Sequence, residues 1–536
     1  MTALRKLIFP WRLCRLPAFL LPLLSLLLYL PALHHGFIMD DRWLIVENPY
    51  IKGWQYLPQM LTQDAWNIWD RHNYWRPVFS ISLALDYSLW GLNPLGFHLT
   101  NILLHAANTT LLYLLGRRLQ NSACALFAAL FFGLHPIQVH AVNVISTRGD
   151  LLAAFFTLLS LHAFFSRRTV LFPLALMLAA LSKETSMVLP LAVLFAWIIV
   201  EKGEQGSRLI LAFVVLGLYL GVRYSLGFSF SLPRSIFSYE TYLAGRLLLA
   251  CKVLALYCLA LFNLFQLPHP FWTAEIPTSV TDPYVLSGIS IFGLVMAAIL
   301  GNLKRNSILA FGLIWFVVYF LPISNLKELN QPMAEHWLYI PMLGLGLAFG
   351  AALDDSFLRL PSARLARVGI TTGVAVFLIF GFLVAGEKSR IYRNDEAFLL
   401  AAMRANPQVP RLYSFMGTVY LTEGDIHKAK EFYAQALVLD PHDFLANYRF
   451  GFILHQTGQP SDAEIYLRRI VQVAPQGLWQ ILPVAHAWEM LGDKEKALFY
   501  YRKALDLNPD SVQTKEKIAG LENLQGPKTG PPGSPP

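Results

Sequence analysis

Residues 16–42 read LPAFLLPLLSLLLYLPALHHGFIMDDR. The apolar run from Leu16 to Leu33 is close to the length of about 20 residues that one membrane crossing needs. Two adjacent acids, Asp40 and Asp41, follow it within one short polar stretch. An acid at the edge of a membrane is costly unless it binds a ligand or takes part in chemistry. The stretch therefore predicts a membrane fold and favours a functional acid pair over a solvated helix end.

The composition of the chain supports the membrane class. Of its 536 residues, 55% are hydrophobic and only 14% are charged, whereas soluble domains carry about 25% charged residues. The net charge of +9 comes mostly from short basic clusters beside apolar runs, as membrane-topology signals do. No basic face or nucleic-acid motif accompanies it, which argues against a nucleic-acid-binding protein. The four cysteines lie in or against apolar segments and imply no disulfide framework.

Hydropathy predicts eleven membrane spans. The first is expected to be a retained helix, because no small-x-small cleavage site follows it. The predicted spans lie near 16–33, 98–116, 122–140, 150–166, 169–182, 185–200, 208–224, 284–301, 307–322, 337–353 and 367–386. With this count the basic clusters at the span ends all fall on one side, which is then cytoplasmic.

The apolar segment 243–265 is the exception to this scheme. If it crossed the membrane, Lys304-Arg305 and the stretch from Arg359 to Arg367 would both move outside. We therefore expect it to be re-entrant or to lie in the interface, and a true span that violates the charge rule is the alternative.

The C-terminal part of the chain contains an internal repeat with a period of 34 residues. Small residues and prolines recur at this period, as in tetratricopeptide helical hairpins. The marker positions are Gly417, Gly451 and Ala485; Gly424, Gly458 and Gly492; Ala429, Ala463 and Ala497; Pro441, Pro475 and Pro509. The predicted domains are a membrane domain 1–386, a half-repeat 387–409, repeats 410–443, 444–477 and 478–511, a cap 512–524 and a disordered tail 525–536. Such arrays bind peptides or partner proteins, or serve as plain scaffolds.

Polar residues gather on the predicted outer side. The loop 34–97 is rich in Trp and Tyr, which fits amphipathic helices at the membrane surface and also fits an aromatic belt. Beside Asp40 and Asp41, the outer segments carry Arg42, Arg76, His135, His140, Arg148, Asp150, Lys183, Glu184, Glu335 and His336. An acid among cations suits transfer from a phosphate-linked donor, because the acid takes a proton while the cations stabilise the leaving phosphate.

Each of these residues also has a structural interpretation. Arg148 and Asp150 would form a salt bridge at a helix end, Lys183-Glu184 a loop charge pair, and His135-Pro136 a kink with a hydrogen-bonded histidine. His135 and His140 do not share a helix face, so their spacing is poor evidence for a metal site.

The order of several motifs resembles a known family. The motifs are Asp40-Asp41, Tyr74-Trp75-Arg76-Pro77, His135-Pro136-Ile137-Gln138-Val139-His140-Ala141-Val142, Arg148-Gly149-Asp150-Leu151-Leu152, Ser182-Lys183-Glu184 and Ala334-Glu335-His336-Trp337-Leu338-Tyr339-Ile340-Pro341, followed by the repeats. The chain resembles the transmembrane O-mannosyltransferases with tetratricopeptide repeats and their bacterial relatives. These are glycosyltransferases of the GT-C fold, and the resemblance covers nearly the whole chain.

The resemblance implies an all-α polytopic membrane protein of GT-C type with a C-terminal α-solenoid. It implies inverting transfer of a mannose-like hexose from a polyprenyl-phosphate donor to a Ser or Thr hydroxyl of an extracytoplasmic protein held by the repeats. The base maps to Asp40 or Asp41, and the phosphate ligands map to Arg76, Arg148, Lys183 and His336. The donor does not demand a metal, and a divalent ion beside Asp40-Asp41 is left open.

Two positions depart from the family pattern. Many relatives carry Glu where this chain has His140 and Arg where it has His336, and histidine is a weaker, pH-dependent phosphate ligand. The short array fits a bacterial member, with the site and repeats facing the periplasm, or the ER lumen in a eukaryote. A non-catalytic, membrane-anchored repeat scaffold for an envelope assembly is the alternative function. A transporter is disfavoured, because the charges cluster at span ends rather than in the middle of spans.

A reporter fused after residue 386 tests this topology. Eleven spans place the repeats outside, on the side of the two acids, so we expect the reporter to be active only in its extracytoplasmic form. A cytoplasmic signal would put the repeats opposite the acids and contradict a role in holding the acceptor.

Overall fold

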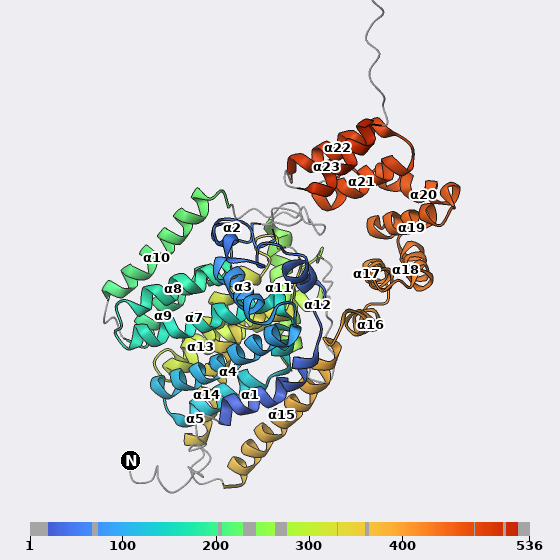
Figure 1. Cartoon of the computed structure of the whole chain (residues 1–536). Helices are drawn as coiled ribbons and strands as arrows, with labels where there is room; N and C mark the ends of the chain where they lie inside the picture. The colour runs from blue at the N-terminus through green and yellow to red at the C-terminus, as the bar shows by residue number, and fades with distance from the viewer. Residues whose placement is uncertain are drawn as a thin grey trace, which may run out of the picture. The chain divides into compact units, whose positions relative to one another are not determined.

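The computed structural model describes residues 20–66, 73–201, 206–228, 243–262, 276–329, 331–359, 364–475, 477–507 and 511–523. These residues are helical with no β-strand, which confirms the predicted all-α class (Figure 1). They divide into two compact units, of which the first ends at Phe398 and the second begins at Leu399. The predicted disordered tail and the basic residues before the first span lie outside the described residues.

The first unit is a bundle of helices joined by short helical turns. Its helices are α1 (Leu20–Tyr29), α2 (Leu57–Thr62), α3 (Pro77–Trp90), α4 (Pro94–Leu119), α5 (Ser122–Leu134), α6 (Val139–Asn143), α7 (Arg148–Phe165), α8 (Leu171–Ser182), α9 (Leu189–Ile199), α10 (Gly206–Ser225), α11 (Leu243–Phe262), α12 (Pro283–Asn302), α13 (Ser307–Phe320), α14 (Pro341–Arg359) and α15 (Arg364–Ile391). The turns include η3 (Arg42–Val46), η4 (Trp54–Tyr56), η5 (Pro136–Gln138), η6 (Ile145–Thr147), η7 (Glu184–Val188) and η9 (Glu335–Leu338).

Helix α4 organises the bundle, packing against α1, α3, α5 and α7. A buried polar stripe runs along it through Asn101, His105 and Asn108. The His105 imidazole hydrogen-bonds the Tyr339 hydroxyl through Nδ1 (2.8 Å) and the Gly133 carbonyl through Nε2 (3.1 Å). Buried polar groups need such partners, so the stripe fixes how α4 sits against its neighbours.

Glycines allow a close crossing of helices α13 and α14. A Cβ atom added at Gly312 of α13 would lie 2.5 Å from the Gly344 carbonyl of α14, and one at Gly344 would lie 2.5 Å from the Gly312 carbonyl. Small residues at membrane helix interfaces let backbones approach in this way.

Each predicted span contains a helix, and four described helices are long and apolar enough to cross a membrane. Three of them, α7, α10 and α12, were predicted as spans, and the bent pair α5 and α6 makes a fifth if it counts as one span. The structure thus supports membrane integration, and the count of eleven stays a prediction.

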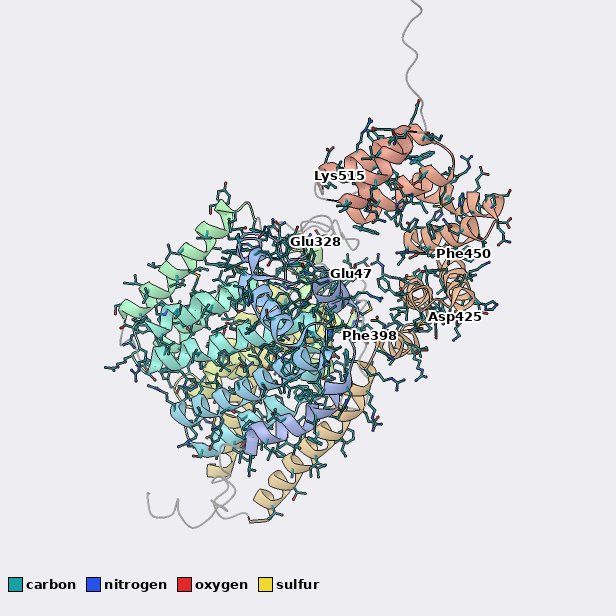
Figure 2. All side chains as sticks on the ribbon, viewed as in Figure 1. Glu47, Glu328, Phe398, Asp425, Phe450 and Lys515 are labelled. Atoms are coloured by element: carbon teal, nitrogen blue, oxygen red, sulfur yellow. The ribbon has the colours of Figure 1, made fainter. Side chains whose placement is uncertain are left out.

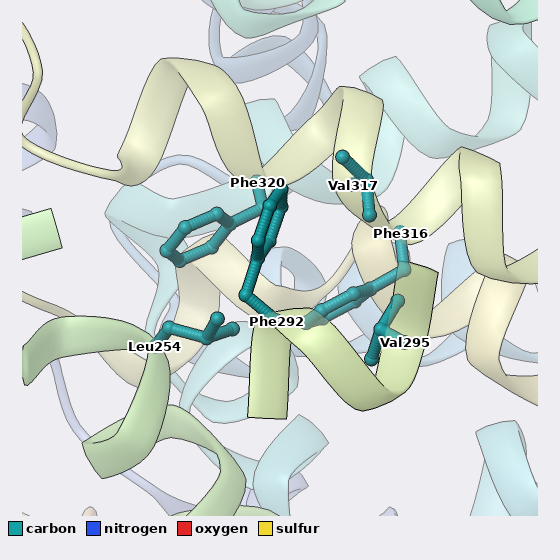
Figure 3. Close-up of a pocket in the computed structure, with 6 residues that line it drawn as sticks. All are labelled: Leu254, Phe292, Val295, Phe316, Val317 and Phe320. Carbon is teal, nitrogen blue, oxygen red and sulfur yellow. The ribbon is translucent and has the colours of Figure 1, made fainter. Parts of the chain in front are cut away.

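The fourth helix of this kind is α11, which was expected to be re-entrant or interfacial. It is one uninterrupted helix of 20 residues, about 30 Å long. A cleft lined only by apolar side chains lies between α11, α12 and α13 (Figure 3), from Leu254, Phe292, Val295, Phe316, Val317 and Phe320. This cleft has no polar group that could take part in a reaction. The expectation that α11 is re-entrant or lies in the interface stays a prediction.

The loop between α1 and α4 has its own small core. Buried Leu44, Ile45, Met60 and Phe79 pack together there, with Ile145 of η6 beneath them. Trp75 is 4% exposed and stacks on Tyr219 of α10. The loop is therefore a folded layer rather than a passive linker, which gives its acids fixed positions.

The second unit consists of consecutive helical hairpins. After α16 (Asp395–Ala405) come α17 (Pro410–Thr422), α18 (Ile426–Leu439), α19 (Phe444–Gln456), α20 (Pro460–Val471), α21 (Leu478–Met490), α22 (Lys494–Leu507) and α23 (Val512–Asn523). Figure 2 labels Asp425 at the start of α18, where its carboxylate accepts a hydrogen bond from the Lys428 backbone N–H (3.1 Å).

The hairpin turns contain the repeated glycines found in the sequence. Gly424, Gly458 and Gly492 have φ of 85°, 79° and 83°, a left-handed conformation that glycine adopts without a steric penalty. The predicted half-repeat differs in one respect. Helix α15 continues to Ile391, so the first residues assigned to the half-repeat from 387 belong to the preceding helix.

Candidate active site

Asp41 joins two segments of the first unit that are far apart in the sequence. Its carboxylate is fully buried and accepts hydrogen bonds from the backbone N–H groups of Ser146 (2.6 Å), Ile38 (3.3 Å) and Ile145 (3.4 Å). Burial raises the pKa of Asp41 to about 7, against the lowering effect of these hydrogen bonds. Asp41 therefore holds the two segments together, because its carboxylate oxygens already accept hydrogen bonds from their backbone N–H groups.

Asp40 has a different environment. Its side chain is half-buried, and among the described residues none donates a hydrogen bond or forms an ion pair with it. The surrounding protein raises the pKa of Asp40 to about 6, because burial disfavours the ionised carboxylate. The negative charge of Asp40 also contributes to raising the pKa of Tyr74, which places the two groups near each other. Asp40 is thus the acid whose oxygens remain available to a ligand.

Arg76 and Glu184 form a bidentate ion pair beside Tyr74. Arg76 Nε lies 2.8 Å from Glu184 Oε2, and Nη2 lies 2.5 Å from Oε1. The guanidinium carbon is 4.5 Å from the centre of the Tyr74 ring. Within the described contacts, Nη1 of Arg76 makes no hydrogen bond, so one face of the guanidinium still has donors for an anion.

Lys183 pairs with Asp150 rather than with its neighbour Glu184. The Lys183 Nζ atom lies 2.7 Å from both carboxylate oxygens of Asp150, and both residues are buried. The charges of Arg76 and Glu184 both act on Lys183, so the two ion pairs lie side by side.

Arg148 lies apart from these pairs, in a closed environment. It is fully buried and lies 2.6 Å from Asp86 Oδ2, which replaces the expected salt bridge to Asp150. Its remaining donors bind Asn101 Oδ1 (2.7 Å) and the carbonyls of Phe97 (2.9 Å) and Ser82 (3.2 Å). Arg148 has no free surface to offer a phosphate group.

Two histidines from distant segments meet at the other end of the cluster. The rings of His140 and His336 are 4.7 Å apart and nearly perpendicular, and Tyr392 contacts His140 at 5.5 Å. His336 Nδ1 is buried and has no hydrogen-bond partner in the described part of the chain. Beside His336, Glu335 forms a buried ion pair with Lys388 at 2.6 Å.

Besides Arg148, two further predicted site residues take no part in the cluster. His135 hydrogen-bonds the Leu261 carbonyl through Nε2 (3.0 Å), and its Nδ1 accepts from the Ile137 N–H (3.1 Å), which is the kink interpretation. The Arg42 side chain is 43% exposed and only 4.0 Å from Glu47. Across the described residues, no group of three or more His, Cys, Asp or Glu is arranged to hold a metal ion.

Several residues of this region were missed in the sequence. Asp86 is the single acid in the apolar run from Val78 to Leu89, and that isolation was a usable signal. Lys388, Tyr392 and Asp395 follow the last predicted span and were assigned to the half-repeat. No sequence pattern connects them to Glu335, His140 or the first loop.

Comparison with known proteins agrees with the predicted resemblance. A protein from Caenorhabditis elegans named protein O-mannosyl-transferase F38B6.6 is 25% identical over 438 residues, covering 78% of this chain and 62% of the relative. The human protein O-mannosyl-transferase TMTC1 is 26% identical over 508 residues, covering 81% and 56%. The chain is thus similar in sequence to proteins named protein O-mannosyl-transferase. It spans about three fifths of the length of these relatives.

The other comparisons concern the repeats and the fold. Residues 390–516 match the family model described as tetratricopeptide repeat, which confirms the predicted array. A solved structure of ArnT from Cupriavidus metallidurans bound to undecaprenyl phosphate is 16% identical, with a TM-score of 0.39 and coverage of 85% of this chain and 80% of that one.

Removal of Asp86 tests the isolation of Arg148. In Asp86→Ala the buried guanidinium loses its counter-ion, and we expect a loss of about 3–5 kcal/mol in the free energy of unfolding. The control Glu47→Ala removes an exposed partner of Arg42 and should cost less than about 1 kcal/mol. Thermal unfolding of the detergent-solubilised protein measures both, and equal melting temperatures would contradict the proposed burial.

Proposed function

We propose that the chain is a membrane glycosyltransferase of GT-C type that moves a mannose-like hexose from a polyprenyl-phosphate donor to a hydroxyl. One observation carries the proposal: Asp40 is a carboxylate with no described hydrogen-bond or ion-pair partner, and it lies near Tyr74, whose ring contacts the paired cation Arg76. The names of the relatives, which match over most of the chain, support the same class of reaction.

In this proposal Asp40 acts as the general base. Its pKa near 6 is well matched to accepting a proton near neutral pH, because it is ionised there yet more basic than an exposed carboxylate. The acceptor hydroxyl loses its proton to Asp40 and attacks C1 of the sugar from the face opposite the phosphate. The C1–O bond to the phosphate then breaks, and polyprenyl phosphate leaves with the bonding pair.

The leaving phosphate needs donors that the ion pairs have not used. Arg76 retains its Nη1 group, the Lys183 ammonium has a third proton beyond its two contacts to Asp150, and His336 has Nδ1. We propose that these three groups bind the phosphate. Glu184 and Asp150 hold Arg76 and Lys183 in place, so that little reorganisation is needed as charge develops.

Arg148 is left out of this phosphate site, although the family resemblance placed it there. Its donors are all directed at Asp86, Asn101 and backbone carbonyls. A divalent ion beside Asp40 is not required for the proposed chemistry, because the donor carries a single phosphate that these cations can stabilise. Whether such an ion binds there is a matter for a metal-dependence assay.

We further propose that the acceptor is a Ser or Thr of an extracytoplasmic protein, bound by the tetratricopeptide array. The support is the match of residues 390–516 to that repeat family, whose arrays bind peptides and partner proteins. The reaction would then take place on the periplasmic face of a bacterial inner membrane, or in the ER lumen of a eukaryote.

Asp40→Asn tests the proposed base. The amide keeps the size of the side chain and cannot accept the proton, so we expect transfer to fall by at least about 100-fold. Mass spectrometry of extracytoplasmic proteins, from cells with the wild-type gene, the variant or neither, would show whether a hexose mass disappears and from which residue. Glu47→Gln in the same loop is the matched control and should keep the modification. Full modification with Asp40→Asn would rule out this role.

The pH dependence of transfer follows from the same pKa. Because the ionised form of Asp40 is the active one, kcat/KM should rise with pH, bend near pH 6 and be flat above about pH 7. At pH 5 it should be about a tenth of the plateau, since one pH unit below the pKa leaves about a tenth of the base ionised. A pH-independent rate between pH 5 and pH 8 would speak against Asp40 as the base.

A further inference from the structure

The residues between the last helix of the bundle and the repeats bind the first outer loop. We call residues 388–395 the junction segment. The Gly36 N–H donates to the Arg393 carbonyl (2.9 Å), and the Met39 N–H donates to Asp395 Oδ1 (2.7 Å). Both contacts fall within four residues of Asp40, on the stretch that leads into it.

The junction segment is itself firmly held. Lys388 forms the buried ion pair with Glu335, and the Asn143 side-chain amide donates to Ser389 Oγ (2.6 Å). The Tyr392 side chain is fully buried beside His140. These three contacts hold the segment against elements that carry the candidate site. The segment that carries Asp395 is therefore fixed in position when Asp395 binds Met39.

Met39 has an unusual backbone conformation. Its φ is 45°, in the left-handed region that is unfavourable for a non-glycine residue. Strained residues persist only where surrounding structure holds them, and they concentrate at functional sites. The hydrogen bond from the Met39 N–H to Asp395 is a direct restraint on this residue. Because Met39 precedes Asp40, its conformation sets the direction in which Asp40 leaves the loop.

The carboxylate of Asp395 is not needed to cap its own helix. Asn394 takes that task, since its Oδ1 accepts a hydrogen bond from the Ala397 N–H (2.9 Å) at the start of α16. Asp395 instead accepts a hydrogen bond from Met39, which lies 356 positions earlier in the chain. A local structural role in α16 therefore does not explain its contact with Met39.

We propose that Asp395 is a positioning residue, which orients the base Asp40 through the strained Met39 peptide. The proposal rests on the function proposed above. Asp395 also opens α16 and lies within residues 390–516, the segment matched to the repeat family. A displacement of the first turn of α16 would therefore move Asp395 and change the orientation of Asp40 through Met39. In this way the start of α16 is linked to the proposed chemistry.

Two substitutions of Asp395 separate positioning from general stability. Asp395→Ala removes the acceptor, and we expect kcat to fall about 10-fold while KM for the donor changes less than about two-fold. Asp395→Asn keeps an oxygen that accepts the same N–H, and should restore kcat to within about three-fold. The assay follows release of polyprenyl phosphate from polyprenyl-phosphate mannose in the presence of extracytoplasmic proteins. Glu423→Ala, an exposed acid of the array, is the control and should match the wild type.

Hydrogen exchange gives a readout that does not depend on activity. In Asp395→Ala, the peptide covering residues 38–46 should exchange its first amides faster than in the wild type, and in Asp395→Asn it should not. If Asp395→Ala does not fold, Asp395→Glu displaces the same carboxylate by one methylene and should show the same loss of kcat. Unchanged exchange and unchanged kcat in these variants would overturn the positioning role. If exchange is faster in Asp395→Ala but the Asp40→Asn variant is still active, the restraint of Met39 by Asp395 is supported. The role of Asp40 as the base is then rejected.

Discussion

The buried carboxylate of Asp41 is the contact on which the position of the loop after α1 depends. It collects three backbone N–H groups, one from its own loop and two from η6. A buried acid is expensive unless its oxygens are hydrogen-bonded, so this arrangement is stable only when both segments are in place. It fixes where the chain lies after the first span. Asp40, the preceding residue, is half-buried, and no described residue donates a hydrogen bond to its carboxylate.

The rest of the site follows a rule of pairwise neutralisation. Arg76 faces Glu184, Lys183 faces Asp150, and Lys388 faces Glu335. Isolated buried charges would cost several kcal/mol each, and pairing reduces that cost. The paired cations keep some donors unused, which is the condition for binding an anion without rearrangement. Asp40 has no such partner among the described residues, and this asymmetry is the basis of its proposed role as the base.

Much of the architecture could be predicted from local patterns. The 34-residue period located the three hairpins and their turns, because each repeat folds by contacts within itself and with its neighbours. The apolar runs located the helices of the first unit. One interpretation was wrong in detail: Arg148 pairs with Asp86 instead of Asp150, whereas His135 has the hydrogen bonds of the kink interpretation. Asp86 comes from a segment far away in the sequence, where hydropathy and spacing give no information.

The sequence by itself determined the helical class, the repeat array and the presence of two acids behind the first apolar run. These depend on short-range periodicity and on composition, which a single chain displays directly. Only the tertiary structure decided which acid lacks a described partner and how the buried cations are paired. Asp41 meets Ser146 across 105 residues and Arg76 meets Glu184 across 108, and the bundle alone brings such groups together. Asp40 and Asp41 are identical in residue type, and they differ because one is covered by backbone donors and the other is not.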